Sequence, residues 1–243
     1  MDLTDKVAIV TGGSTGIGKA IAEKYVEEGA NVVIADIDTE KGQSTAEEIG
    51  CDFKECDVSD RDAVQNMVEY TVEEHGQLDA IVNNAGIGRA SKLGEMEYDE
   101  WDQVMAVNLT GVMNCSKEAL PHLKETEGAI INIASIYGLV GGPGATAYSA
   151  AKGGVVNFTR NVAVDYAAEN VRCNAICPGF VETPMTEDML EDEKFYNFVK
   201  TETPMERVAQ PEEIAGIAAF LASDEASYIT GANIPVDGGW TAH

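Results

Sequence analysis

Basic residues are scarce in this chain of 243 residues, which has 16 Lys and Arg against 42 Asp and Glu and a formal net charge of −26. Such a charge repels nucleic acid and anionic membrane surfaces, so we expect neither as a partner. A dense carboxylate surface fits either a high-salt cytoplasm or ordinary acidic drift. The composition does not decide between them, and we favour salt adaptation.

Apolar runs long enough to span a membrane are also missing. The first residues, MDLTDKVAIVTGG, lack the basic segment and following apolar segment of a secretory signal peptide. We therefore expect a cytoplasmic protein.

Cysteine is sparse and irregularly spaced. The five cysteines are an odd number, none of them forms a Cys-x-x-Cys pair, and the three histidines do not cluster near them. Reduced, buried thiols are therefore favoured over disulfides, and we expect no metal site. The cysteines are Cys51, Cys56, Cys115, Cys173 and Cys177.

Short apolar runs alternate with helix-like segments along the chain. The run KVAIVT at 6–11 is continuously apolar, as a strand buried on both faces should be. The segment that follows has apolar side chains at helical spacing and ends at Gly29. Strands are expected at 6–11, 31–36, 51–57, 78–84, 128–135, 171–179 and 231–239, and helices at 18–28, 39–49, 60–75, 99–123 (one or two helices), 148–169 and 211–223.

This alternation predicts an α/β fold, a Rossmann-type doubly wound sheet of seven mainly parallel strands with helices on both faces. No Pro-, Gly- or Ser-rich linker, change of composition or internal repeat divides the chain. We therefore expect residues 1–243 to form a single dinucleotide-binding catalytic domain.

The glycine-rich stretch TGGSTGIG at 11–18 lies directly between the first expected strand and the first helix. Glycines permit a tight turn there and let backbone N–H groups approach a pyrophosphate at the helix N-terminus, where the helix dipole favours anions. An acidic residue, Asp36, closes the second strand about 20 positions later, as in dinucleotide-binding folds. The pattern predicts a dinucleotide site.

Asp36 also indicates which dinucleotide is bound. Its carboxylate can accept hydrogen bonds from the adenosine ribose hydroxyls but would repel a 2′-phosphate. Ile37 and Asp38 supply no compensating base, and Lys19 is the one basic residue nearby. The expected cofactor is therefore NAD rather than NADP. Asp57, after the third strand, either contacts the adenine edge or caps the next helix.

These motifs together resemble the short-chain dehydrogenase/reductase family. TGGSTGIG, NNAG at 83–86, Asn108, Ser135, YSAAK at 148–152, PG at 178–179 and Thr183 occur in the family's order and approximate spacing. The resemblance covers essentially the whole chain, and the motifs are specific in combination although each alone is loose. It implies cofactor contacts from Gly12, Ser14, Thr15, Gly16, Ile17, Gly18, Asp36, Ile37, Asp57, Val58, Asn84, Ala85, Gly86, Tyr148, Lys152, Pro178, Gly179, Val181 and Thr183.

The same resemblance implies the catalytic residues Asn108, Ser135, Tyr148 and Lys152. Tyr148 and Lys152 are four positions apart and share a helix face. A free phenol has a pKa near 10, and we expect the neighbouring ammonium to lower the pKa of Tyr148 towards that of a general acid–base. By resemblance, Lys152 also holds the nicotinamide ribose. Ser135 would donate a hydrogen bond to the substrate oxygen.

Asn108 is the hardest of the four to explain from the residues alone, which allow a packing or capping role within a helix. The resemblance implies that its backbone holds a water linking Lys152 to solvent, and that NNAG forms a positioning turn. It also implies a homotetramer assembled through the helices at 101–123 and 148–169. The implied reaction moves a hydride between nicotinamide and the carbinol carbon while Tyr148 exchanges a proton with its oxygen.

The expected substrate is a small neutral secondary alcohol or ketone, cyclic or aryl-alkyl, so the enzyme would be an NAD-dependent alcohol dehydrogenase or ketone reductase. In this family the segment at about 183–208 forms a substrate lid, and here its side chains offer an apolar inner surface. The stretch IYGLVGGPGATA at 136–147 has no charged side chain, and no Arg is available to clamp an anionic group. The expected substrate contacts are Ser135, Tyr137, Gly179, Met185, Met189 and Leu190.

Three alternatives remain. A 3-oxoacyl-carrier-protein reductase fits the motifs, but that enzyme typically uses NADP and docks an acidic carrier protein on basic residues, and Asp36 and the net charge of −26 argue against both. A sugar dehydrogenase is a further enzymatic alternative. An NAD(H)-binding sensor without catalysis is the non-enzymatic alternative, and the presence of both Tyr148 and Lys152 argues against it.

Overall fold

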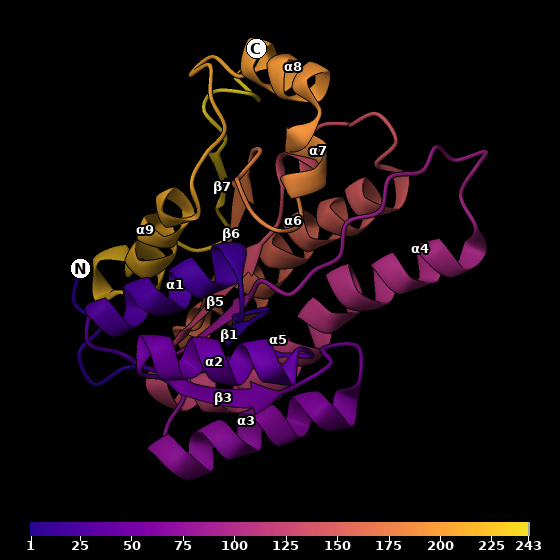
Figure 1. The fold of residues 1–243 in the computed structure, drawn as a ribbon. Coiled ribbons are helices and arrows are strands. Elements are labelled where there is room, and N and C mark those ends of the chain that lie inside the picture. Colours follow the sequence, from indigo (N-terminus) through magenta and orange to yellow (C-terminus); the bar gives the residue numbers. More distant parts are fainter. Residues whose placement is uncertain (243) are drawn as a thin grey trace.

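A single parallel sheet organises residues 1–242, the part of the chain that the computed structural model describes. Seven strands follow the order β3-β2-β1-β4-β5-β6-β7, and every neighbouring pair is parallel (Figure 1). This confirms the predicted doubly wound α/β fold and makes the sheet wholly rather than mainly parallel. The strands are β1 (Val7–Thr11), β2 (Asn31–Asp36), β3 (Asp52–Glu55), β4 (Ala80–Asn83), β5 (Ala129–Ile133), β6 (Arg172–Pro178) and β7 (Asn233–Val236).

Helices connect the strands close to the predicted positions. Three of them begin with carboxylate caps: Asp38 accepts a hydrogen bond from the backbone of Lys41, and Asp60 accepts from the backbone of Asp62 and Ala63. Asp192 caps the third in the same way, through the backbone of Lys194 and Phe195. The helices are α1 (Gly16–Glu27), α2 (Thr39–Ile49), α3 (Arg61–His75), α4 (Tyr98–Met105), α5 (Gly111–Thr126), α6 (Thr146–Tyr166), α7 (Glu187–Glu191), α8 (Glu193–Glu202) and α9 (Pro211–Ala222). None of the helices within residues 1–242 is long and apolar enough to cross a membrane.

A π-helical turn, Ala106–Thr110, joins α4 to α5 without a break in the helical backbone. The predicted segment at 99–123 is thus two α-helices in one continuous rod. A π turn is wider than an α-helical turn. Such turns are rare in proteins, and many of those known lie at functional sites. This one carries Asn108, whose side chain is fully buried.

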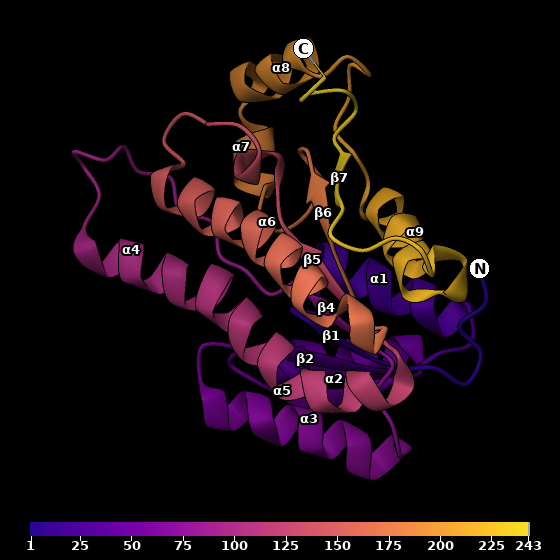
Figure 2. The same cartoon turned by 180° about the vertical axis from the view of Figure 1, so that it is seen from behind.

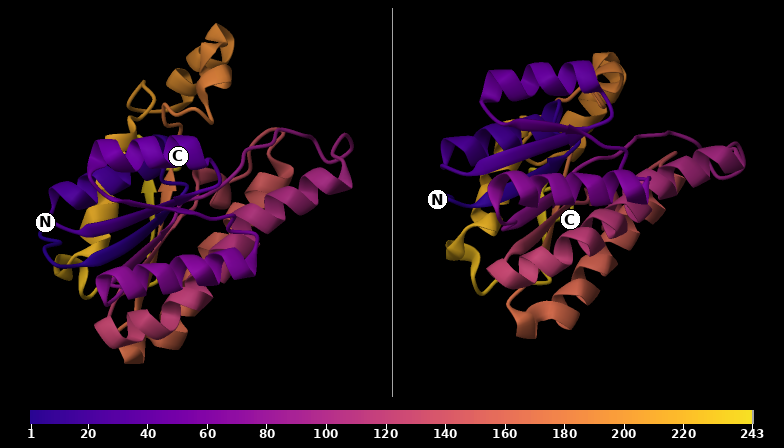
Figure 3. Two further views of the ribbon diagram at one scale, coloured as in Figure 1. Left: turned by 60° about the horizontal axis from the view of Figure 1, so that its bottom comes forward. Right: turned by 90° about the horizontal axis from the view of Figure 1, so that it is seen from below.

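Two layers of helices cover the sheet. Apolar side chains of α1, α2 and α9 pack on one face, and those of α3, α5 and α6 pack on the other (Figures 2 and 3). Every residue of β1, β4 and β5 is buried, because both faces of these central strands are covered. This double burial explains why their sequences are mostly apolar.

The order of the strands positions the site. The chain leaves β1 towards β2 and β3, then returns to place β4 on the other side of β1. A doubly wound sheet opens a crevice at the carboxyl ends of the strands where the order reverses, and ligands bind there. The N-terminus of α1, directly after β1, lies at this crevice.

A buried polar network ties β4, β5, α5 and α6 together. The Asn83 amide donates to Oδ1 of Asn132 at 2.8 Å and to Oγ of Ser116 at 3.0 Å. Asn132 in turn donates to Oγ1 of Thr159 at 2.9 Å. All four side chains are buried, so the hydrogen bonds replace water that these groups have lost.

Asn132→Ala should destabilise the protein by about 1–3 kcal/mol, because it leaves the amide of Asn83 and the hydroxyl of Thr159 short of a partner inside the core. Urea unfolding followed by circular dichroism measures the change. Asn161→Ala is the matched control, since the bond from Asn161 to Asp165 is exposed and its loss should change stability by less than about 0.5 kcal/mol. Equal midpoints for the two variants would contradict a stabilising role for the network.

Candidate active site

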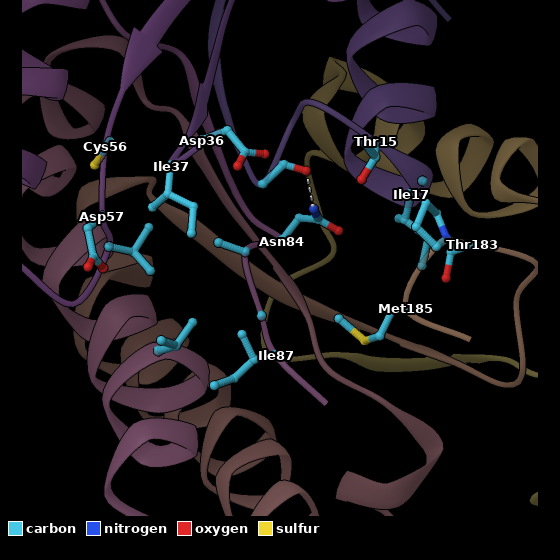
Figure 4. A pocket seen from close by; sticks show the side chains of 17 residues that line it. Thr15, Ile17, Asp36, Ile37, Cys56, Asp57, Asn84, Ile87, Thr183 and Met185 are labelled. Carbon is cyan, nitrogen blue, oxygen red and sulfur yellow. Dashed lines mark hydrogen bonds between the residues drawn. The ribbon is translucent and has the colours of Figure 1, made fainter. Parts of the chain in front are cut away.

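A cavity of about 340 Å³ lies at the carboxyl edge of the sheet, where β1 and β4 meet (Figure 4). Asp36 and Asp57 lie at one end of it, Thr15, Thr183 and Met185 lie at the other, and Asn84 lies between them. Its lining residues are Gly12, Thr15, Gly16, Ile17, Asp36, Ile37, Cys56, Asp57, Val58, Asn84, Ala85, Gly86, Ile87, Val107, Thr183, Pro184 and Met185.

The N-terminus of α1 suits this cavity to an anion. Within residues 1–242, no side chain caps the helix at Thr15, and its first turn contains no acidic residue. The first backbone N–H groups of a helix have no intrahelical partner, and the helix dipole makes this end positive. The residues present therefore fit the pyrophosphate of a dinucleotide.

Close packing behind the glycine-rich loop requires Gly18. A Cβ at this position would overlap the carbonyl oxygen of Gly12 and come within 2.5 Å of Nδ2 of Asn84. That Asn84 amide donates to the carbonyl oxygens of Thr11 and Gly12, which fixes the loop against the end of β4. Gly18 thus supports the cavity from behind, although it does not line it.

Asp36 reaches the cavity from the end of β2. Its carboxylate accepts hydrogen bonds from the backbone N–H groups of Ser14 and Asp38, both at 3.2 Å. Lys19 points elsewhere: its Nζ lies 2.7 Å from a carboxylate oxygen of Glu48, a hydrogen bond that raises the pKa of the lysine. Lys19 is therefore paired with Glu48 and not with Asp36.

Asp57 also lines the cavity, and the structure decides one of its two alternatives. The N-cap of α3 is Asp60, so Asp57 does not cap that helix. Its carboxylate instead accepts hydrogen bonds from the backbone N–H and the hydroxyl of Ser59, at 2.9 and 2.7 Å. Contact with an adenine ring stays a prediction.

A second cavity of about 100 Å³ adjoins the first and shares Ile17, Asn84, Gly86, Thr183 and Met185 with it. Ser135 follows β5, whereas Tyr148 and Lys152 come from the first turns of α6. The three side chains line this one space. The other lining residues are Ile133, Ala134, Pro178, Gly179, Val181 and Thr186.

Lys152 is almost fully buried. Its Nζ donates to the carbonyl oxygen of Ile133 at 2.7 Å and lies 5.7 Å from the centre of the Tyr148 ring. Burial disfavours the ammonium and lowers the pKa of Lys152 to about 8. The proton on this lysine is therefore exchangeable near physiological pH.

Tyr148 differs from the sequence expectation. Burial raises the pKa of its phenol above the usual value, a hydrogen bond with Ser135 lowers it, and nearby Tyr137 raises it. The effect of burial is the largest of the three, because the buried phenol has lost the water that would solvate a phenolate. In the structure the phenol is therefore the favoured form at neutral pH.

Asn108 uses its side chain on the backbone of the neighbouring loop. Its Oδ1 accepts from the N–H of Ile87 at 2.8 Å, and its Nδ2 donates to the carbonyl oxygen of Ile87 at 2.9 Å. This paired contact holds the segment after NNAG against the π turn. The packing role that the residues alone allowed is thus present, and the water-binding role of the backbone stays a prediction.

Known proteins resemble the chain over nearly its whole length. A short-chain dehydrogenase/reductase family model, described as enoyl-(acyl carrier protein) reductase, matches residues 12–241. The chain is a short-chain dehydrogenase/reductase. Members of this family are oxidoreductases that bind a nicotinamide cofactor, and the cavities described above have the place and the groups for one.

Two relatives and one solved structure illustrate the similarity. The chain is 42% identical to the 3-oxoacyl-(acyl-carrier-protein) reductase FabG of Thermotoga maritima, over 98% of this chain and 99% of the relative. It is 43% identical to the meso-2,3-butanediol dehydrogenase of Serratia marcescens, over 100% of this chain and 97% of the relative. The crystal structure of gox2181 is 35% identical, covers 100% of this chain and 98% of its own, and has a TM-score of 0.97.

The predicted substrate residues of this short-chain dehydrogenase/reductase divide into two groups. Ser135, Gly179 and Met185 line the second cavity, and the backbone N–H of Tyr137 donates to Oγ of Ser135 at 3.1 Å. Leu190, in contrast, faces a separate hollow of about 500 Å³ with Glu182 and Tyr196. Met189 is 40% exposed and lines neither of the two cavities.

Sequence reasoning missed several apolar lining residues. Cys56, Ile87, Val107 and Pro184 line the first cavity, and Ile133, Ala134 and Thr186 line the second. Cys56 and Ile87 directly flank predicted residues, which is the only signal they carried. Ser14 acts indirectly: its backbone N–H holds Asp36, and its carbonyl oxygen accepts from Thr45.

Thiols and metal ligands form no further centre in the described part of the chain. All five cysteines are free, and four of them are buried. Among residues 1–242, no group of three or more His, Cys, Asp or Glu side chains is arranged to hold a metal ion.

Gly18→Ala should weaken NADH binding at least about tenfold, because the added methyl group displaces the backbone of Gly12 and the amide of Asn84. Quenching of protein fluorescence by NADH measures the affinity. Gly216→Ala is the control: this glycine lies inside α9, and nothing in residues 1–242 lies within 4 Å of a Cβ there. NADH affinity unchanged in Gly18→Ala would contradict the tight packing behind the loop.

Proposed function

We propose that this enzyme transfers a hydride between NAD and a small neutral secondary alcohol or ketone, with a cyclic or aryl-alkyl group favoured, and that Tyr148 is its general acid–base. One observation carries the proposal: Ser135, Tyr148 and Lys152 line a single cavity that adjoins the cavity containing Asp36. This arrangement supports a proton-transfer group next to a dinucleotide site.

The protein's own residues would divide the work as follows. When bound, the nicotinamide supplies the hydride chemistry. Ser135 uses a lone pair to accept from the N–H of Tyr137, and its hydroxyl would donate to the substrate oxygen. Tyr148 gives a proton to that oxygen during reduction and removes it during oxidation. Lys152, within 5.7 Å of the ring centre, stabilises the negative charge when the phenol is deprotonated.

The preference for NAD rests on charge. Asp36 lines the adenosine end of the cavity, and Lys19 is engaged by Glu48. A 2′-phosphate would meet the carboxylate there, whereas ribose hydroxyls can donate to it. The cofactor would be held by the glycine-rich loop, Asp36, Asn84, Lys152 and Thr183.

The preference for an uncharged substrate rests on the residues around Tyr148. Of the residues of the described chain that line the two cavities, Lys152 is the only one with a cationic side chain, and its ammonium is committed to Ile133 and Tyr148. An anionic substrate would therefore lack a bidentate partner. The similarity to a butanediol dehydrogenase agrees with a small neutral alcohol.

The second candidate is a 3-oxoacyl-carrier-protein reductase, favoured by the similarity to FabG proteins. Docking of an acidic carrier protein needs a basic surface, and a chain with net charge −26 opposes it. A sugar dehydrogenase and a non-catalytic NAD(H) sensor rank behind it. The single domain, the homotetramer through α4, α5 and α6, and the cytoplasmic location remain parts of the proposal.

The decisive experiment follows NADH and NADPH oxidation separately with cyclic, aryl-alkyl and short-chain ketones and an acetoacetyl thioester, at low and high salt. NADH should support turnover at least about tenfold better than NADPH, and neutral ketones should be preferred. Asp36→Ala should reduce the ratio of NADH-supported to NADPH-supported turnover. Efficient NADPH-dependent reduction of the thioester would establish the second candidate, and NADH binding without turnover of any substrate would favour the sensor.

Tyr148→Phe should lower turnover by roughly 100- to 10,000-fold while NADH affinity stays within about twofold, because only proton transfer is lost. Tyr166→Phe, on the same helix but stacked with Lys124, is the control and should remain active.

The pH dependence follows from the raised pKa of Tyr148 and the lowered pKa of Lys152. A raised phenol pKa keeps the acid form at neutral pH, so alcohol oxidation should increase as pH rises. Ketone reduction should decline as pH rises through about 8, where Lys152 loses its proton. Profiles of kcat/KM in both directions measure this, and a reduction rate that is flat to pH 10 would contradict the role of Lys152.

A further inference from the structure

Five aromatic side chains from four separate segments form one partly exposed group, which we name the aromatic cluster: Tyr137, Phe180, Phe195, Phe198 and Trp240. Phe180 lies at its centre, with ring centres 5.3 Å from Trp240, 5.5 Å from Phe195 and 6.1 Å from Tyr137. Phe198 contacts Trp240 at 6.0 Å. Most of these pairs meet edge to face or tilted, the favourable geometry for aromatic rings.

Two members of the aromatic cluster adjoin residues of the cavity beside Tyr148. Tyr137 donates its backbone N–H to Ser135, and Phe180 lies between Gly179 and Val181, which both line the space beside Tyr148. Two other members, Phe195 and Phe198, belong to the lid helix α8. Figure 1 shows α8 and the C-terminal segment at the same end of the molecule.

Trp240 belongs to a tight C-terminal turn. The Asp237 carboxylate accepts hydrogen bonds from the N–H of Gly239 at 2.9 Å and from the N–H and hydroxyl of Thr241 at 2.9 and 2.6 Å. The N–H of Trp240 donates to the carbonyl oxygen of Asp237 at 3.2 Å. One carboxylate thus fixes the backbone on both sides of the indole, which presents Trp240 as a rigid group.

This turn lies directly on the segment that follows α8. The N–H of Met205 donates to the carbonyl oxygen of Gly238 at 3.1 Å. Gly238 has a positive φ of 63°, and a Cβ there would lie 2.7 Å from Cγ2 of the buried Thr203. The C-terminal turn and the end of the lid are therefore in contact through backbone and side chains together.

The two helices of the lid segment, α7 and α8, contain few buried residues. Within the described chain, Val199 is the one buried residue of α8, and α7 has none. The position of α8 therefore depends on Val199, the aromatic cluster and the contact at Gly238. Few buried apolar contacts mark segments of low local stability.

We propose that Trp240 is a specificity-determining residue. It holds α8 through Phe198 and joins Phe180 in an aromatic wall at the substrate entrance, so substrates with a ring or branched alkyl group on the carbinol carbon are preferred over short polar ones. This inference rests on the proposed function and extends it, because it assigns the apolar side of the substrate to a residue remote in sequence from every catalytic motif.

Trp240→Ala should raise KM for a cyclic or aryl-alkyl ketone roughly tenfold relative to a short hydroxyketone, with kcat and NADH affinity within about twofold of wild type. Trp240→Phe should recover most of the loss, because it keeps an aromatic ring in the wall. Tyr228→Ala, at a fully exposed tyrosine, is the control and should change neither KM. An equal loss for both ketones, or no loss, would overturn the proposal.

A second measurement does not need turnover. Hydrogen exchange of backbone amides at 187–202 should be faster in Trp240→Ala than in wild type or Tyr228→Ala, while exchange in β1, β4 and β5 stays unchanged. If no substrate is turned over at all, the proposed function fails, and this measurement still tests whether Trp240 holds the lid. Unchanged exchange at 187–202 would overturn that role.

Discussion

The reversal of strand order between β1 and β4 is the constraint on which the rest of this structure depends. Because β1 pairs with β2 on one side and β4 on the other, the loops after β1 and β4 separate and leave the dinucleotide cavity between them. The exposed N–H groups of α1, the carboxylate of Asp36 and the amide of Asn84 meet there only because their strands are neighbours. Complete burial of the central strands makes this arrangement stable.

The two residues proposed for proton transfer, Tyr148 and Lys152, are affected by burial in opposite directions. Burial lowers the pKa of Lys152 to about 8 and raises that of Tyr148, so each charged form is disfavoured on its own. Each remaining polar group has a defined partner: Ile133 accepts from Lys152, Ser135 accepts from Tyr137, and Asn108 pairs with Ile87. Low-dielectric surroundings of this kind strengthen the interaction between two charges when both are present, which would favour the proposed general acid–base chemistry.

The proposed catalytic residues and the proposed lid differ in how many buried residues hold them. Ser135 directly follows β5, and Tyr148 and Lys152 lie on α6, two elements with many buried residues, whereas Val199 is the one buried residue of α7 and α8. In the proposed function, this difference would allow the apolar side of the substrate pocket to vary while Ser135, Tyr148 and Lys152 keep their positions. Trp240, near the C-terminal end of the chain, packs against Phe180 and against Phe198 of α8.

Local patterns in the sequence were sufficient for the elements and motifs. Short strand-like runs alternating with helical segments predicted all seven strands, the limits of α2 were predicted at 39–49, and four-residue spacing placed Lys152 beside Tyr148. Only the tertiary structure decided which side chains face a shared space. Leu190 lines a hollow other than the one beside Tyr148, Asp60 rather than Asp57 caps α3, and burial raises the pKa of Tyr148 above its usual value. Periodicity reports contacts within one element, whereas solvation, cavity lining and the meeting of Trp240 with α8 depend on segments that are distant in the chain.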